Sequence, residues 1–138
     1  MTKFFEAPKI IEIPKHSDHR GNLSVVDSET CLPFELKRVF YVYDIPSGIK
    51  RGGHAHKTLH QFLWCLSGSV KVHTVNAKGE EKDFTLSLPW EGLHIPPMTW
   101  AYEESVSAGC VYMVGASDHY IEEDYIRSTD VFNSMIIE

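Results

Sequence analysis

Apolar and polar side chains alternate along most of the chain between residues 8 and 117. In the segment 69–75, Val70 and Val72 alternate with Lys71 and His73, and this period of two places the two sets on opposite faces of a β-strand. His73 is therefore expected on the solvent side. Other alternating or β-rich runs predict strands at 9–13, 22–27, 37–43, 61–66, 82–88, 92–95, 99–102 and 110–116.

Turn-forming residues separate these runs, and short strands at this spacing predict an all-β sandwich or barrel. The turn around Gly79 is rich in charged residues, as expected for a hairpin tip in water. A helical segment is predicted only at 122–132. Because no repeat or linker divides the chain, residues 1–138 are expected to form a single domain.

Composition narrows the expected partners and location. The 138 residues include 13 Lys and Arg against 19 Asp and Glu, a net charge of −6, which is the wrong sign for a surface that grips nucleic acid. No apolar run approaches the roughly 18 residues of a membrane span, and the first residues do not resemble a signal peptide. We therefore expect a cytoplasmic protein without nucleic-acid or membrane partners. Cys31, Cys65 and Cys110 lack metal-binding spacing and are expected to be buried free thiols.

Candidate chemistry concentrates around two histidines. His54 and His56 would project from the same face of a strand, with Ala55 on the opposite face. Gly52 and Gly53 precede them and allow a ligand to approach the backbone closely. Two imidazoles in one cavity favour acid–base catalysis, because the ordinary histidine pKa of about 6.5 lies near neutral pH. A hydrogen-bonded pair of core histidines is the alternative interpretation.

A pattern of glycines and histidines surrounds this pair, and it consists of Gly48, His54, His56 and Gly68. It resembles the first signature motif of the cupin superfamily, whose fold is a small β-barrel of jelly-roll type. Metal-binding cupins use three histidines and a glutamate, but here Gln61 stands at the acidic position. The second motif, at residues 92–102, has no histidine at its end. A tightly held catalytic metal normally has at least three protein ligands. We therefore expect this protein to bind no catalytic metal ion, unless His94 turns inward and supplies a third ligand.

Four longer blocks follow one another with specific gaps across about residues 9–133. They are Asp18–Leu23, Lys37–Tyr41, Arg51–Lys57, and Ala116–Tyr120 together with Glu123–Arg127. In this order they resemble the sugar-nucleotide 3,4-ketoisomerases, a WxcM-like branch of the cupins. The resemblance implies a cupin jelly-roll β-barrel with a short C-terminal helical segment. It also implies an isomerase that moves the ketone of dTDP-4-oxo-6-deoxyglucose from C4 to C3 in deoxysugar biosynthesis, as used for cell-surface polysaccharides.

Within this resemblance, His54 and His56 are the candidate acid and base, because the reaction removes a proton at C3 and returns one at C4. The resemblance favours His56 as the C3 base and His54 as its partner at C4. Tyr41 either donates a hydrogen bond to the enediolate oxygen or is a half-buried strand tyrosine. The candidates for binding the substrate are Arg20, Arg38, Arg51, Lys57 and Gln61. The alternative interpretation is that they are ordinary surface or strand residues. The histidines without a feature pointing to catalysis are His16, His19, His60, His94 and His119.

The expected partner is a dTDP-linked 4-oxo-6-deoxy sugar, and members of the family are generally homodimers. No cofactor is expected, because the net reaction exchanges protons and not electrons with the enzyme, and the chain has no dinucleotide-binding or P-loop motif. Three other functions stay open: a 3,5-epimerase of the same sugar nucleotide, a metal-dependent cupin oxygenase, and a noncatalytic sugar-binding cupin. The sequence leaves open the stereochemistry at C4 of the product, the nucleotide base and the downstream sugar.

Overall fold

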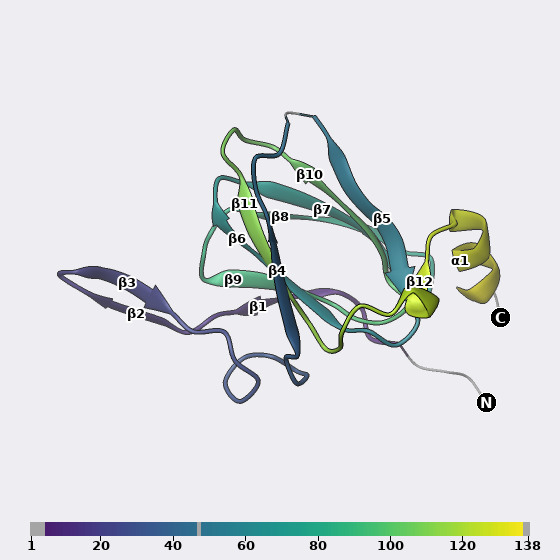
Figure 1. Ribbon diagram of the computed structural model, residues 1–138, viewed down its shortest axis with the longest axis horizontal. Helices are drawn as coiled ribbons and strands as arrows, with labels where there is room; N and C mark the ends of the chain where they lie inside the picture. Colours follow the sequence, from purple (N-terminus) through teal and green to yellow (C-terminus); the bar gives the residue numbers. More distant parts are fainter. Residues whose placement is uncertain (1–4, 47, 137–138) are drawn as a thin grey trace.

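The structure, a computed structural model, describes residues 5–46 and 48–136. Its strands form two five-stranded antiparallel sheets and a separate hairpin (Figure 1). The first sheet has the order β1 (Lys9–Glu12), β9 (Glu91–Ile95), β6 (Gln61–Ser67), β11 (Val111–Ala116) and β4 (Arg38–Val42). The second has the order β12 (Tyr125–Ile126), β5 (Lys50–His56), β10 (Trp100–Ser105), β7 (Val70–Val75) and β8 (Glu81–Leu86). The hairpin pairs β2 (Lys15–Asp18) with β3 (Gly21–Ser24).

The two sheets face each other and bury one apolar core between them. Strand β7 shows the predicted alternation: Val70 and Val72 are fully buried, whereas Lys71 and His73 lie on the outer face. His73 is paired there with the carboxylates of Asp83 and Glu81. Across the described residues, backbone pairing does not close the sheets into one continuous barrel. The architecture is all-β and jelly-roll-like, as the sequence predicts.

Each sheet also carries a covering layer on its outer face. The long connection before β4 lies against the first sheet, where Leu32 packs with Phe62 and Trp64. Helix α1 (Thr129–Ile136) covers the second sheet through Phe132, which packs with Trp100. These layers explain why both faces of the central strands are apolar.

The C-terminal segment differs from the predicted helix over 122–132. It begins with a single 3₁₀ turn, η1 (Glu122–Asp124), continues into β12, and becomes α-helical only in α1. The reason is a long-range contact: β12 pairs with the end of β5, where Tyr125 lies opposite His56. The short C-terminal helix expected from the family is present, but a strand that borders the histidines precedes it.

The β2–β3 hairpin extends away from the two sheets, on the opposite side of the molecule from α1 (Figure 1). The sequence pattern predicts a strand at 22–27 but misses its partner β2, whose four residues are all exposed. Cys65 and Cys110 are buried free thiols, as expected, whereas Cys31 is only partly buried. Among the described residues, no helix is long and apolar enough to cross a membrane.

Candidate active site

A bulge in strand β5 determines which side chains enter the space between the sheets. In the pairing of β10 with β5, Tyr102 lies opposite Gly52 and Ala101 opposite His54, so Gly53 is an extra residue. Both glycines have positive φ angles, 84° and 79°, which residues with a β-carbon adopt only at a cost. Because the bulge shifts the alternation by one residue, Arg51 and His54 line the same cavity.

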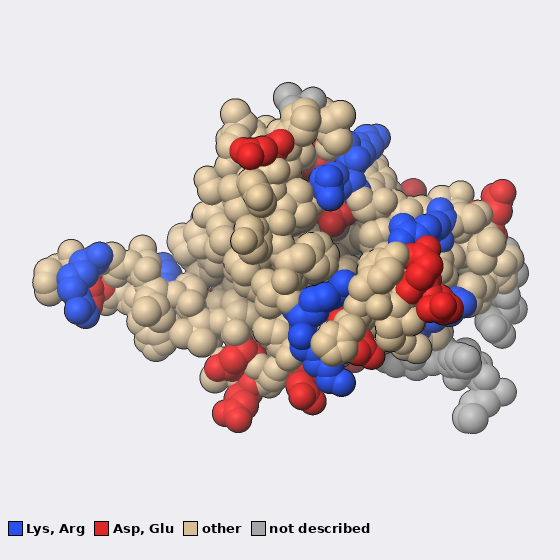
Figure 2. All heavy atoms as spheres, in the orientation of Figure 1, with Lys and Arg blue, Asp and Glu red and all other residues tan. Residues whose placement is uncertain are grey.

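This central cavity has a volume of about 270 Å³ and opens to solvent between the sheets. Its polar lining consists of Arg51, His54, Gln61, Glu103, Tyr112, Tyr125 and Arg127, and Phe40 and Val42 are apolar lining residues. Figure 2 shows basic side chains gathered around a hollow on this face of the molecule. The volume lies just below the roughly 300–1,000 Å³ of typical small-molecule pockets. It suits one sugar ring better than a whole sugar nucleotide.

His54 lines the cavity and lies next to His56, and the ring of Tyr125 contacts both histidines. Their ring centroids are 5.0 Å apart, and the Tyr125 ring lies 5.0 Å from His54 and 4.3 Å from His56. Burial lowers the pKa of His54, and the charge of Arg127 lowers it further. Burial, together with the neighbouring His54, lowers the pKa of His56 to about 4. Both imidazoles are therefore neutral near pH 7 and able to accept a proton.

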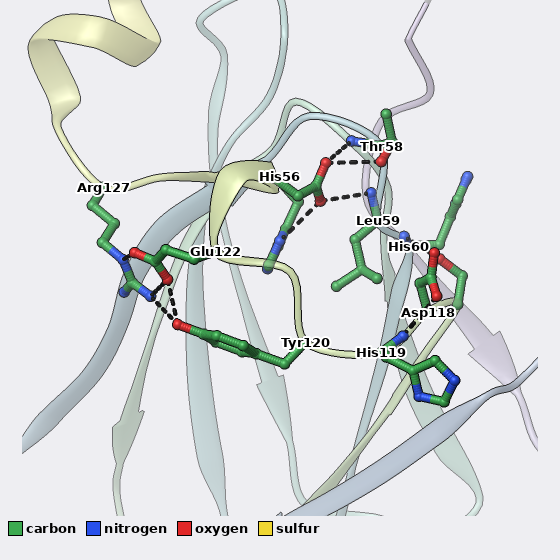
Figure 3. A network of polar contacts seen from close by, with 11 residues as sticks. His56, Thr58, Leu59, His60, Asp118, His119, Tyr120, Glu122 and Arg127 are labelled. Carbon is green, nitrogen blue, oxygen red and sulfur yellow. Dashed lines mark hydrogen bonds and ion pairs between the residues drawn. The ribbon is translucent and has the colours of Figure 1, made fainter.

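The carboxylate of Asp124 lies against the inner side of His56. Nδ1 of His56 is 3.3 Å from Oδ2 of Asp124, which is close enough for an ion pair but lacks the alignment of a hydrogen bond. The same carboxylate accepts hydrogen bonds from the backbone N–H groups of Thr58 and Leu59, at 2.9 and 3.1 Å, and from the Thr58 hydroxyl at 2.8 Å (Figure 3). Asp124 is thus held in place independently of the histidine that it faces.

A second, much smaller pocket lies on the other side of Tyr125 and contains Arg38 and His56. Nε and Nη2 of Arg38 are buried and have no hydrogen-bond partner among the described residues. Buried guanidinium nitrogens without partners are energetically costly, so an anionic or carbonyl group placed here would satisfy them. The pocket itself has a volume of only about 10 Å³, which is room for about one water molecule.

Arg127 forms a further basic border of the central cavity. Its guanidinium donates two hydrogen bonds to the Glu122 carboxylate, at 2.9 and 2.8 Å, and its Cζ lies 4.3 Å from the centroid of the Tyr125 ring. Tyr120 also contacts Glu122 (Figure 3). This network fixes the C-terminal segment beside the histidines.

The structure brings together His54, Arg51 and Gln61 in the central cavity, and His56 with Arg38 in the adjoining pocket. Tyr41 lies outside both, because Arg38, Phe40 and Val42 take the inward positions of β4 and leave Tyr41 on the outer face, 61% exposed. Its ring stacks on Tyr43 instead. The predicted role of Tyr41 in orienting an enediolate finds no support in this placement.

Two other candidates also lie away from the histidines within one chain. Lys57 follows His56 but is exposed and lines neither pocket. Arg20 lies in the turn of the β2–β3 hairpin, where its side chain is 79% exposed and pairs with Asp18 at 2.6 Å. A role for Arg20 at this chain's own cavity is therefore not supported by its position.

His94 does not reach the cavity either. It lies on the outer face of β9, with Nε2 3.0 Å from Nδ1 of His60 and with Phe34 stacked nearby. Across residues 5–46 and 48–136, no group of three or more His, Cys, Asp or Glu side chains is arranged to hold a metal ion. His54 and His56 thus gain no third imidazole ligand from β9.

Comparison with known proteins identifies the family of this chain. The family model described as WxcM-like, C-terminal matches residues 6–136. The chain belongs to the WxcM-like family of sugar-nucleotide ketoisomerases. It is 41% identical over 128 residues to the TDP-4-oxo-6-deoxy-α-D-glucose-3,4-oxoisomerase of Aneurinibacillus thermoaerophilus, covering 93% of this chain and 91% of that protein.

Solved structures of sugar 3,4-ketoisomerases have the same fold. The sugar 3,4-ketoisomerase QdtA of Thermoanaerobacterium thermosaccharolyticum, in complex with TDP, superposes with a TM-score of 0.87 at 38% identity, covering 92% of each chain. WlaRA, the TDP-fucose-3,4-ketoisomerase of Campylobacter jejuni, gives a TM-score of 0.89 at 26% identity, covering 96% of this chain and 97% of that chain. A variant of QdtA with one histidine replaced by asparagine has been solved in complex with TDP-4-keto-6-deoxyglucose.

The WxcM-like blocks contained more of the site than sequence reasoning assigned. Asp124, Tyr125 and Arg127 fall within the last matched block but had no predicted role. They reach the histidines only through the pairing of β12 with β5. Glu103 lies in no matched block and just beyond the strand predicted at 99–102, so no sequence signal pointed to it.

Proposed function

We propose that this protein moves the ketone of a TDP-linked 4-oxo-6-deoxy sugar from C4 to C3 by histidine acid–base catalysis, without a metal ion. The observation that carries this proposal is that His54 lines a sugar-sized cavity with basic walls and that His56 lies next to it. The family membership supports the same reaction. Such a step belongs to deoxysugar biosynthesis.

The protonation state of the pair fits the first step. One neutral imidazole accepts the proton at C3, and the electrons of the broken C–H bond form the C3=C4 double bond of an enediolate. The imidazolium then returns a proton to C4, either directly or after transfer to the second ring, whose centroid is 5.0 Å away. The lowered pKa values of both rings keep them in the accepting form before substrate binds.

The basic residues supply sites for the negatively charged diphosphate. Arg51 lines the central cavity. Arg38 has two buried, unpartnered nitrogens, but its pocket holds only about 10 Å³, so its side chain would have to turn out of this pocket to reach a phosphate. Guanidinium groups bind phosphate oxygens in a bidentate manner. Gln61, 8% exposed in the same cavity, is placed to bind a sugar hydroxyl. Because the cavity suits only one sugar ring, the nucleotide would lie at its mouth.

We further propose that the protein is a homodimer. Strand β4 is the edge of its sheet, and its outer face carries Val39 and Tyr41, which are 43% and 61% exposed. Exposed apolar edge strands favour pairing with another chain. A second copy would also give a role to the projecting hairpin, whose Arg20 would reach a site on the partner and not its own. Light scattering on the purified protein measures this directly, and a monomer at all concentrations would contradict it.

Proton nuclear magnetic resonance with dTDP-4-oxo-6-deoxyglucose in deuterated water tests the reaction. The expected result is a 3-oxo product, whose configuration at C4 also assigns the galacto or gluco series. Hydrogen at C4 would indicate direct return of the C3 proton, and deuterium would indicate its exchange with solvent. A 3,5-epimerase would exchange protons at C3 and C5 and leave the ketone at C4. A noncatalytic binding protein would exchange neither. Turnover should survive exhaustive chelation; loss of activity that one stoichiometric metal restores would contradict the metal-free mechanism.

A further inference from the structure

The central cavity contains a carboxyl group that the two-histidine mechanism does not use. Glu103 lies on β10 on the same inner face as Ala101, with Arg51 as its partner on β5. Its side chain extends over Gly52, where a β-carbon would overlap Oε2 of Glu103. The glycine therefore makes room for the carboxyl group, which lies in the wall of the cavity that also contains His54.

The proposed reaction has a second proton transfer that needs a group of this kind. While one proton moves from C3 to C4, another must leave the hydroxyl oxygen on C3 and reach the former ketone oxygen on C4. The group that carries it must both donate and accept a proton. Among the described residues that line the central cavity, Glu103 has the only carboxyl group. The guanidinium of Arg51 only donates, and the amide of Gln61 does not exchange its protons in this way.

We propose that Glu103 is a catalytic residue that carries the proton between the two substrate oxygens. As a carboxylic acid it donates its proton to the oxygen on C4 while a histidine removes the proton at C3, and an enediol forms. The resulting carboxylate then accepts the proton of the hydroxyl on C3. As C4 is protonated, C3 and its oxygen become the new ketone. Each proton is accounted for, and no further reactant is needed. This inference rests on the proposed ketoisomerase function.

The surroundings of Glu103 favour the acid form that the first step requires. Burial raises the pKa of Glu103 to about 8, and the positive charge of Arg51 opposes this only in part. Within the described residues, no side chain forms a hydrogen bond or ion pair with its carboxyl group. The other titratable groups lining the cavity are His54 and Arg51 on β5, Tyr112 on β11, Tyr125 on β12, and Arg127. Burial also raises the pKa of Tyr112, so this phenol stays protonated and adds no competing negative charge.

Replacement of Glu103 by glutamine provides the test, because Glu103→Gln keeps the shape of the side chain and removes its transferable proton. The variant should bind TDP as tightly as the parent and lose at least about a hundredfold in isomerisation rate, the usual scale for a positioned acid or base. It should retain exchange of the C3 proton with deuterated water better than it retains product formation. Glu104→Gln changes the next carboxyl of the same strand, outside the cavity lining, and should leave the rate unchanged.

The pH dependence of the parent enzyme gives a second, independent measurement. Because Glu103 must start as the acid, kcat should fall as the pH rises through about 8, and this limb should be absent in Glu103→Gln. A folded Glu103→Gln variant with nearly parental kcat overturns the proposal. If the variant does not fold, a parental kcat that stays flat well above that pH overturns it. If the parent itself forms no 3-oxo product, the proposed function fails instead, which keeps the two failures distinguishable.

Discussion

The ring of His56 is set against the carboxylate of Asp124, with Nδ1 3.3 Å from Oδ2. Since three donors from Thr58 and Leu59 hold that carboxylate, the contact orients the imidazole and leaves Nε2 as the nitrogen directed away from Asp124. A carboxylate behind a histidine also stabilises the imidazolium that forms when the ring accepts a proton. Asp124 is therefore a positioning residue for the base, 68 positions further along the chain than His56.

Asp124→Asn should lower kcat by about a hundredfold, because a small misplacement of a catalytic group has an effect of this size. The amide oxygen can still accept both hydrogen bonds from Thr58, and only the one from the N–H of Leu59 is lost. We therefore expect the variant to fold and to bind TDP with unchanged affinity. Steady-state kinetics with titration of TDP separates the two quantities. The control is Glu123→Gln, an exposed carboxylate on the same 3₁₀ turn. Equal losses in the two variants would contradict a specific role for Asp124.

His54→Asn and His56→Asn should each lose at least about a hundredfold in isomerisation rate, with little change in TDP affinity. Proton exchange in deuterated water distinguishes their roles. A variant that exchanges the C3 proton but forms no product has kept the base and lost the transfer to C4. His73→Asn, on the outer face of β7, is the control. A folded double variant that isomerises at nearly the parental rate would refute the mechanism.

The strands were predictable where the buried side chains are the apolar ones of an alternating sequence pattern. Residues 70–75 alternate between buried and partly exposed positions, and the sequence pattern follows them closely. The outward position of Tyr41 was not predictable, because in the run 38–43 both alternating sets contain apolar residues and the period alone does not tell which face points inward. In the folded chain Phe40 lines the central cavity and Tyr41 lies on the outer face.

The two histidines were predictable from local spacing, whereas their surroundings were not. His54 and His56 share a face because they lie two residues apart. The positions of Asp124 and Tyr125 depend on the pairing of β12 with β5, a contact between distant segments that no local pattern encodes. The same holds for the bulge at Gly53, which brings Arg51 into the cavity and is visible only in the register against β10.

Arg51→Ala should weaken binding of TDP about ten- to hundredfold, because a charge-assisted contact to phosphate contributes roughly 1.5–3 kcal/mol. Calorimetric titration with TDP alone is the measurement, since it excludes effects on the sugar and on catalysis. Lys78→Ala removes a positive charge from the exposed turn between β7 and β8 and serves as the control. Parental affinity in Arg51→Ala would mean that the diphosphate binds elsewhere.

His94→Gln should flatten the dependence of stability on pH. His94 is fully buried on the outer face of β9, where burial, with a contribution from His60, lowers its pKa to about 4. Burial likewise lowers the pKa of His60. In the unfolded chain histidine has a pKa of about 6.5, so between about pH 4 and 6.5 the unfolded chain binds more protons than the native state. The stability of the native state is therefore complete above about pH 6.5 and declines as the pH falls towards 4.

Thermal unfolding at about pH 7.5 and about pH 5 measures the decline as a drop in Tm. The parent should lose several degrees between the two conditions, and His94→Gln should lose less, because glutamine takes up no proton. His54 and His56 also have lowered pKa values, so part of the decline persists in the variant. His16→Gln, on the exposed hairpin, should keep the parental difference in Tm. An equal drop in the parent and in His94→Gln would show that the His60–His94 pair does not make the fold sensitive to acid.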